Sequence, residues 1–140
     1  MTKRNVLLTG AAGRIGSFLT NQWRERYNLT LTDVRQPKNT FNFPFVAAEL
    51  SDFAAVRKLC EGIDTVVHLG ADPRMEAPWE TLLPSNVIGA YNVFESAHQA
   101  GCRRIIFASS INAVFGYPID QQINTSMPVN PINLYGATKC

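Results

Sequence analysis

The sequence predicts an α/β fold in which a doubly wound parallel sheet carries helices on its faces. Short apolar runs alternate along the 140 residues with segments of helical periodicity. This alternation is typical of parallel strands joined by right-handed crossovers. The segments that could carry chemistry also follow the predicted strands directly, and parallel sheets bind ligands at the carboxyl ends of their strands.

About five strands are predicted, at residues 4–9, 29–33, 43–50, 64–71 and 103–110. The flanking helices are predicted at residues 14–27, 53–60, 79–100 and from about 131 onward. Ser51 or Asp52 could cap the second helix, and Gly101 could end the third. Pro84 inside the third helix predicts a kink or a new helix start.

The composition argues against several classes of protein. Apolar residues make up 46% of the chain, and 13 basic residues nearly balance 11 acidic ones, so no nucleic-acid partner is expected. No apolar run approaches the roughly 18 residues of a membrane span, and the N-terminal apolar run is too short for a secretory signal. Cys60, Cys102 and Cys140 fit neither a disulfide framework nor a metal site, so reduced thiols in a cytoplasmic protein are expected.

A glycine-rich loop, "TGAAGRIG", joins the first predicted strand to the first predicted helix. In such a loop Gly10 permits a tight turn, Gly13 lets the backbone approach a pyrophosphate, and Gly16 lets the helix pack on the sheet. The helix N-terminus adds free N–H groups and a partial positive charge. The strand–loop–helix context predicts a dinucleotide site, and a simple strand-to-helix turn is the alternative.

An acidic residue, Asp33, ends the second predicted strand about 20 residues after the glycine loop, where a ribose-binding carboxylate is expected. A carboxylate accepts hydrogen bonds from ribose hydroxyls and repels a 2′-phosphate, which favours NAD over NADP. Two alternatives remain. Asp33 could only cap a turn, and Arg14 or Arg35 could meet a 2′-phosphate.

Tyr135 and Lys139 lie four residues apart in "LYGATK" and would share one face of a helix. A lysine ammonium near a phenol favours the phenolate form. Such a tyrosine can take a proton from a substrate hydroxyl while a hydride leaves for a nicotinamide. An ordinary surface pair is the alternative interpretation.

The motifs "TGAAGRIG", "HLGA", "FASS" and "YGATK" stand in the order and spacing of a known family. In these motifs the chain resembles the extended short-chain dehydrogenases/reductases, the NAD-dependent epimerase/dehydratase group. The resemblance implies an NAD-binding Rossmann domain over residues 1–140, which we expect to be truncated at its C-terminus. It implies that Tyr135 is the catalytic acid/base and that Lys139 binds the nicotinamide ribose. The implied cofactor contacts are Gly10, Gly13, Arg14, Ile15, Gly16, Asp33, Glu49, Leu50, Leu69, Gly70, Ala71, Asn86, Tyr135 and Lys139.

The family also places a hydroxyl side chain just after the fifth strand, where it orients the substrate's reacting oxygen. Alignment on the strand end assigns this role to Ser110, whereas alignment on "VFG" would place Ile111 there. We expect Ser110 to be catalytic, Asn112 to contact substrate, and Ser109 to cap the strand end. His68 lies within a predicted buried strand and is expected to be a hydrogen-bonded core residue.

The closest resemblance is to the branch that oxidises free sugars, which includes uronate, aldose and aldose-phosphate dehydrogenases. Uronate dehydrogenases tend to carry Asn-His where this chain has Ile111 and Asn112, which argues against a uronate. The implied reaction moves a hydride from C1 of a cyclic sugar to NAD and gives a lactone. A nucleotide-sugar epimerase or dehydratase, or a non-catalytic truncated dinucleotide-binding module, are the alternatives. A homodimer is expected for the full-length protein.

Overall fold

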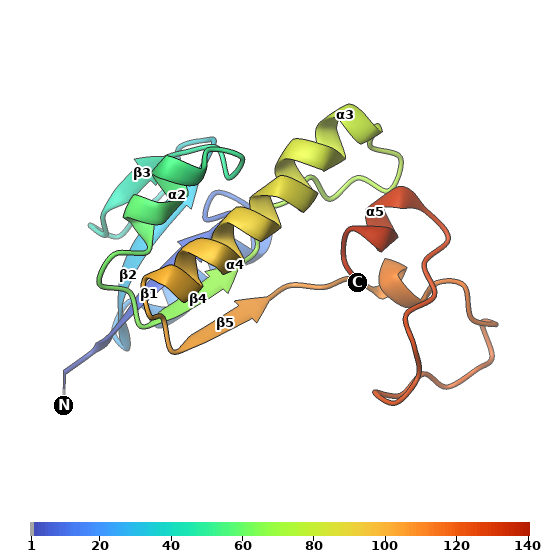
Figure 1. Ribbon diagram of the computed structural model, residues 1–140. Helices are drawn as coiled ribbons and strands as arrows, with labels where there is room; N and C mark the ends of the chain where they lie inside the picture. Colours follow the sequence, from blue (N-terminus) through green and yellow to red (C-terminus); the bar gives the residue numbers. More distant parts are fainter. Residues whose placement is uncertain (1) are drawn as a thin grey trace.

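All five predicted strands form, and they join a single parallel sheet. The computed structural model describes residues 2–140 (Figure 1). The strands run in the spatial order β3-β2-β1-β4-β5. Their bounds are β1 Arg4–Thr9, β2 Tyr27–Asp33, β3 Phe45–Ala47, β4 Thr65–His68 and β5 Arg104–Phe107. The order reverses between β1 and β4, so the loops that leave these two strands lead to helices on opposite faces, at the edge where doubly wound sheets bind ligands.

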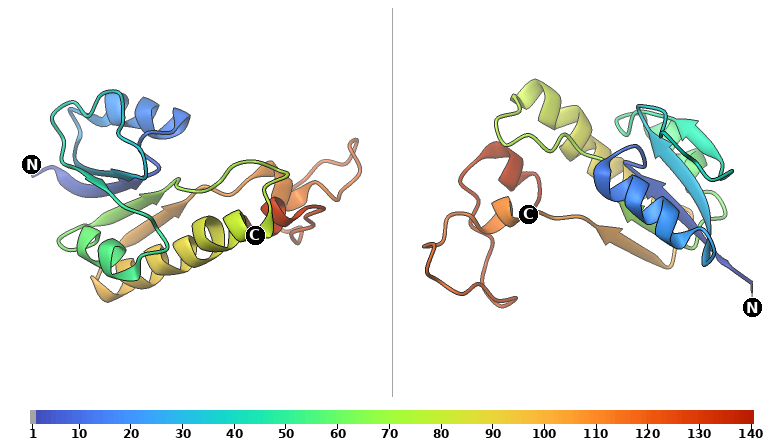
Figure 2. Two further views of the ribbon diagram at one scale, coloured as in Figure 1. Left: turned by 90° about the horizontal axis from the view of Figure 1, so that it is seen from above. Right: turned by 180° about the vertical axis from the view of Figure 1, so that it is seen from behind.

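Helices cover both faces of this sheet (Figure 2). Helix α1 (Arg14–Trp23) lies on one face, and α2 (Phe53–Leu59) and α4 (Gly89–Gln99) lie on the other. Side chains along β1 alternate between the two layers, because successive residues of a strand point to opposite faces. Leu7 packs with Val56 and Val93, whereas Val6 and Leu8 pack on the α1 side. The predicted Rossmann architecture is therefore confirmed.

The first helix is shorter than predicted. Helix α1 ends at Trp23, and Tyr27 already pairs with Arg4 as the first residue of β2. The rings of Trp23 and Tyr27 meet edge to face with their centroids 5.5 Å apart. The apolar spacing of Trp23 and Tyr27 therefore reflects packing across a turn and not a continuing helix.

The third predicted helix is continuous but is not uniformly α-helical. It comprises α3 (Trp79–Leu82), the π-helical turn η1 (Leu83–Ile88) and α4. The Gly89 N–H bonds to the carbonyl of Pro84, five residues earlier. Pro84 lacks an N–H and cannot donate to the preceding turn, and the wider turn accommodates it without a break. Within residues 2–140, no helix is long and apolar enough to cross a bilayer.

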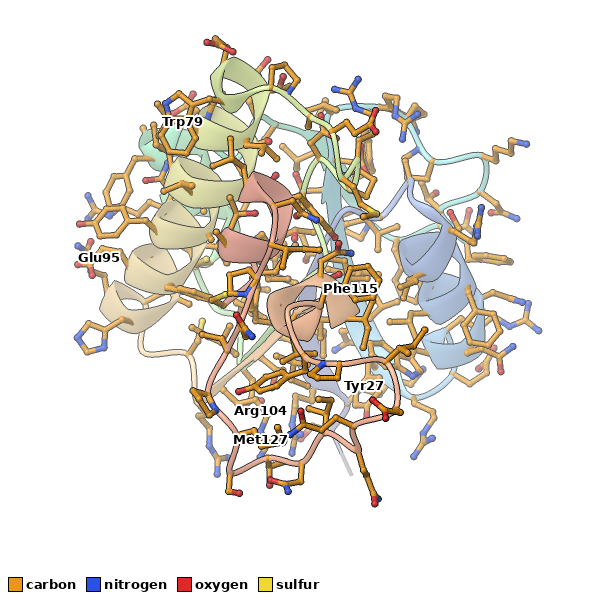
Figure 3. The ribbon with its side chains drawn as sticks, turned by 90° about the vertical axis from the view of Figure 1, so that its right-hand side faces the viewer. Tyr27, Trp79, Glu95, Arg104, Phe115 and Met127 are labelled. Atoms are coloured by element: carbon orange, nitrogen blue, oxygen red, sulfur yellow. The ribbon has the colours of Figure 1, made fainter. Side chains whose placement is uncertain are left out.

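The last helix, α5 (Leu134–Ala137), begins three residues later than predicted. It begins there because the Asn133 side chain accepts a hydrogen bond from the Gly136 N–H. Helix α5 and the short 3₁₀ helix η2 (Ile111–Val114) lie beyond the carboxyl end of β5, at the opposite end of the molecule from the N-terminus. Figure 3 looks onto this end, with Phe115 between α1 on one side and the α3–α4 helix on the other.

Candidate functional site

Close approach of backbone to backbone accounts for two of the three loop glycines. Gly10 has φ +69, and a Cβ on it would lie 2.8 Å from the Gly70 nitrogen. A Cβ on Gly16 would overlap the carbonyl oxygen of Gly10. The glycine loop after β1 therefore touches the loop after β4, and α1 packs tightly on the turn that precedes it.

The N-terminus of α1 can accept an anion. Gly13 is the N-cap residue and provides no side-chain cap among the described residues, so the first-turn N–H groups point out of the helix end. The side chains of Arg14 and Ile15 are exposed on this turn. Free N–H groups and the helix dipole together fit the pyrophosphate of a dinucleotide.

The Asp33 carboxylate lies beside the glycine loop. Its Oδ2 accepts from the Ala12 N–H at 3.0 Å, and its Oδ1 accepts from the Arg35 N–H at 3.0 Å. Asp33 therefore does cap a turn, and it also contacts the loop. Each carboxylate oxygen can accept a further hydrogen bond, so ribose hydroxyls remain possible ligands.

A hydrogen-bonded threonine and histidine join the ends of β1 and β4. Thr9 Oγ1 accepts from the N–H groups of Leu69 (3.2 Å) and Gly70 (3.1 Å). Its proton is therefore available for His68 Nδ1 at 2.8 Å, which assigns the Nε2–H tautomer to the imidazole. Burial, with a smaller contribution from the Lys139 charge, lowers the pKa of His68 to about 4. The core assignment of His68 is confirmed, whereas the role of Thr9 was not expected from the sequence.

The residues after β3 pack under the loop that follows β4. A Cβ on Gly70 would lie 2.6 Å from Leu50 Cδ1, so the two residues are in direct contact. The Leu50 carbonyl accepts from Asn92 Nδ2 at 2.8 Å, which fixes this segment against α4. Glu49 is exposed, and Ala71 is half-buried.

Asn86 is buried in η1 and joins the loop after β4 to α5. Its Oδ1 accepts from the Asp72 N–H at 2.8 Å. Its Nδ2 donates to the Asp72 carbonyl and to Thr138 Oγ1, both at 3.1 Å. Both ends of the amide are thus bonded to protein, and Asn86 holds two loops of the site together.

Tyr135 and Lys139 are both buried, but they lie in different surroundings. Tyr135 packs with Ala77 and Leu82. Lys139 lies beyond the end of α5, and its Nζ donates to the Ala108 carbonyl at 3.1 Å. Burial lowers the pKa of this ammonium. Within residues 2–140, no hydrogen bond joins Lys139 to the Tyr135 hydroxyl, so the two side chains of the predicted pair are not bonded to each other.

The two serines after β5 have different partners. Ser109 Oγ donates to the Lys139 carbonyl at 2.6 Å and ties this strand end to the end of α5. Ser110 Oγ accepts from the backbone N–H of Asn112 at 3.2 Å and from its Nδ2 at 3.3 Å. Asn112 Oδ1 in turn accepts from Asn133 Nδ2 at 3.0 Å. Asn133 was not expected as a site residue from the sequence, although an asparagine at the start of a helix is a typical N-cap signal.

The structure gathers these groups at the carboxyl edge of the sheet. The N-terminus of α1 follows β1 and the Asp33 carboxylate ends β2, whereas Ser110 follows β5, Tyr135 lies on α5 and Lys139 lies just beyond α5. The first set can hold a dinucleotide. The second set can move a proton on a bound hydroxyl.

Comparisons with known proteins agree with this arrangement. A family model described as "NAD dependent epimerase/dehydratase family" matches residues 6–140. The NAD-dependent glucose-6-phosphate dehydrogenase of Haloferax volcanii is 33% identical, with 96% of this chain and 58% of the relative covered. A uronate dehydrogenase of Pseudomonas putida is 37% identical, with 96% and 51% covered.

Solved structures give the same result. Uronate dehydrogenase from Agrobacterium tumefaciens superposes with a TM-score of 0.90 at 36% identity, over 100% of this chain and 53% of the other. A tyrosine-to-alanine mutant of uronate dehydrogenase from that organism, complexed with NAD, gives a TM-score of 0.90 at 34% identity, over 99% and 53%. The chain thus spans about half the length of the relatives it matches.

Proposed function

Because this chain belongs to the NAD dependent epimerase/dehydratase family, we propose that it forms the cofactor-binding part of an NAD-dependent sugar dehydrogenase. The observation that carries the proposal is the placement of two sets of groups at one sheet edge. The first set is the glycine loop and helix N-terminus after β1 with Asp33 at the end of β2, and the second is Ser110, Tyr135 and Lys139 after β5. The proposed substrate class is a sugar with a free C1 hydroxyl, since the two relatives described above are named as dehydrogenases of glucose 6-phosphate and of uronate.

The proposed NAD site extends along the carboxyl ends of the strands. The first turn of α1 holds the pyrophosphate, and Asp33 binds the adenosine ribose. Its carboxylate disfavours the 2′-phosphate of NADP. Glu49 and Leu50 lie by the adenine, and Lys139 binds the nicotinamide ribose. The remaining proposed contacts are Gly10, Gly13, Arg14, Ile15, Gly16, Leu69, Gly70, Ala71 and Asn86.

Oxidation of a C1 hydroxyl removes a hydride from carbon and a proton from oxygen, and a cyclic sugar becomes a lactone. Bound NAD supplies the hydride acceptor. The Tyr135 phenolate takes the proton and is left as the phenol. Lys139, which is buried, acts together with Tyr135 in this proposal, and Ser110 holds the reacting oxygen.

A substrate panel on the full-length protein tests this function. NADH absorbance is followed with aldoses, aldose phosphates and uronates, and turnover of at least one of these sugars is expected. Interconversion of a nucleotide sugar without net NADH would instead assign an epimerase. Binding of NAD without turnover of any of these substrates would assign a non-catalytic module.

We further propose that the full-length protein is a homodimer in the cytoplasm. Apolar side chains on η1 and α4, namely Ile88 and Tyr91, are exposed and available for a second copy. Cys60, Cys102 and Cys140 are free thiols, which fits a reducing compartment. Because basic and acidic residues nearly balance, the proposal includes no nucleic-acid partner. Size-exclusion chromatography with light scattering measures the oligomeric state.

A further inference from the structure

We propose that Asn112 and Asn133 form a directed hydrogen-bond relay that makes Ser110 a hydrogen-bond donor toward the reacting oxygen of the substrate. The relay runs from the backbone of α5 to the serine after β5. The contact between Ser110 and the substrate rests on the function proposed above. The hydrogen bonds among the asparagines and Ser110 are contacts within the described chain.

The direction of the relay is set at α5. The Gly136 N–H donates to Asn133 Oδ1 at 2.6 Å, and a backbone N–H can only donate. The oxygen of the Asn133 amide therefore faces the helix, and its nitrogen faces Asn112. Asn133 Nδ2 donates to Asn112 Oδ1 at 3.0 Å, which leaves the nitrogen of the second amide for Ser110. Reversal of one amide alone would place two donors or two acceptors face to face.

Two donors therefore converge on the Ser110 oxygen. The backbone N–H of Asn112 lies 3.2 Å from Ser110 Oγ, and Asn112 Nδ2 lies 3.3 Å from it. A hydroxyl has two lone pairs and one proton. With both lone pairs engaged, the proton is free to donate. Ser110 is only half-buried, so this proton can reach a ligand at the sheet edge.

A donor at this position suits the reaction. Negative charge builds on the C1 oxygen as its proton leaves for Tyr135, and a preorganised donor stabilises that charge. Asn112 is 6% exposed, and its amide is bonded on both sides. Asn112 is therefore a positioning residue that acts through Ser110, in place of the direct substrate contact expected from the sequence.

The relay also ties Ser110 to the tyrosine helix. Gly136 follows Tyr135 directly, and a Cβ on Gly136 would press into the backbone carbonyl oxygen of Asn112. Helix α5 and η2 thus touch through backbone, and the two asparagines hold them in one register. These contacts hold the segment that carries Ser110 against the helix that carries Tyr135.

The decisive variant is Asn133→Asp in the full-length protein. A carboxylate still accepts from the Gly136 N–H, so the helix cap is kept, but the donor to Asn112 is lost. The Asn112 amide then turns to give its nitrogen to the carboxylate, and its oxygen takes the Ser110 proton. We expect kcat to fall about 10²-fold, as when one preorganised donor is removed. The KM for the sugar and the Kd for NAD should change less than about threefold, since ground-state binding is kept.

Asn124→Asp is the matched control. Asn124 lies in the same loop, is exposed, and uses its Oδ1 to accept from the Ser126 N–H at 3.0 Å, a bond that a carboxylate keeps. The control introduces the same charge and should leave kcat unchanged. In a Ser110→Ala background, Asn133→Asp should cause no further fall in kcat, because both substitutions act through the Ser110 hydroxyl. Full activity of Asn133→Asp, or an additive loss in that background, would overturn the relay.

A second measurement separates this inference from the proposed function. Nuclear Overhauser effects from the Asn112 side-chain NH₂ should reach the Ser110 β-protons in the unaltered protein. In Asn133→Asp they should reach the β-protons of residue 133. If the unaltered protein oxidises no sugar but shows this pattern, the proposed function fails and the relay stands. If the NH₂ of the unaltered protein faces residue 133, the relay is wrong whatever the activity.

Discussion

The Thr9 hydroxyl lies 2.8 Å from Nδ1 of His68, and this contact joins the ends of the two central strands. β1 and β4 are neighbours in the sheet, and their following loops carry the two halves of the proposed cofactor site. Gly10, which follows Thr9, also lies close to Gly70, whose N–H donates to the Thr9 hydroxyl. The pair therefore holds the glycine loop against the loop after β4.

His68 should make the free energy of unfolding depend on pH. The window runs from about 4, the pKa of His68 in the folded chain, to 6.5, its ordinary pKa. In this window the unfolded chain binds the additional proton, so the free energy of unfolding falls as the pH falls. The loss approaches about 3 kcal/mol near pH 4. Urea unfolding at several pH values measures it. His68→Gln should remove this part of the pH dependence, and His98→Gln, at an exposed position on α4, should keep it. Identical profiles for His68→Gln and the unaltered chain would contradict the assignment.

Gly16→Ala should damage the pyrophosphate site. The new Cβ would overlap the Gly10 carbonyl and lie 2.7 Å from the Ala11 Cα, so the loop must move. We expect the Kd for NAD to rise about tenfold or more, with a loss of stability of about 1–3 kcal/mol. Isothermal titration calorimetry measures the Kd. Gly62→Ala is the control. The φ of +70 at residue 62 strains an alanine there, but the new Cβ would meet nothing within 4 Å. Tight NAD binding by Gly16→Ala would remove the loop from the cofactor site.

Asp33→Asn should narrow the preference for NAD over NADP. The side-chain oxygen can still accept from the Ala12 N–H, but the negative charge that opposes a 2′-phosphate is gone. We expect the ratio of the two Kd values to shrink about tenfold, which corresponds to about 1.4 kcal/mol. Asp52→Asn, at the cap of α2, changes the same charge away from the loop and should leave the ratio unaltered. A ratio unaffected by Asp33→Asn would show that Asp33 only caps its turn.

Tyr135→Phe should abolish turnover in the full-length protein and leave NAD binding intact. Without the hydroxyl there is no group to take the C1 proton, and loss of a general base costs about 10²–10⁴-fold in rate. Steady-state kinetics and NAD titration together measure the two effects. Tyr117→Phe is the control, since that hydroxyl donates to the Pro128 carbonyl in an exposed loop. Full activity of Tyr135→Phe would assign the proton transfer to another group.

Much of the fold could be predicted from local patterns. Apolar runs located the five strands, and Gly101 ended α4 as expected. The errors fell where a distant partner decides the boundary. Tyr27 belongs to β2 because it pairs with Arg4, and Pro84 is absorbed in a π-helical turn whose Asn86 reaches Asp72 and Thr138.

The sequence by itself determined the alternation of strands and helices, the glycine loop and the place of Asp33 at the end of β2, because periodicity and turn chemistry act between residues close along the chain. The tertiary structure alone decided the partners of the buried polar groups. Thr9 meets His68 across 59 positions, and Asn133 meets Asn112 across 21. Such bonds form only where the fold brings distant segments together. The orientation of a buried amide is set by the backbone group that lies next to it in the folded chain.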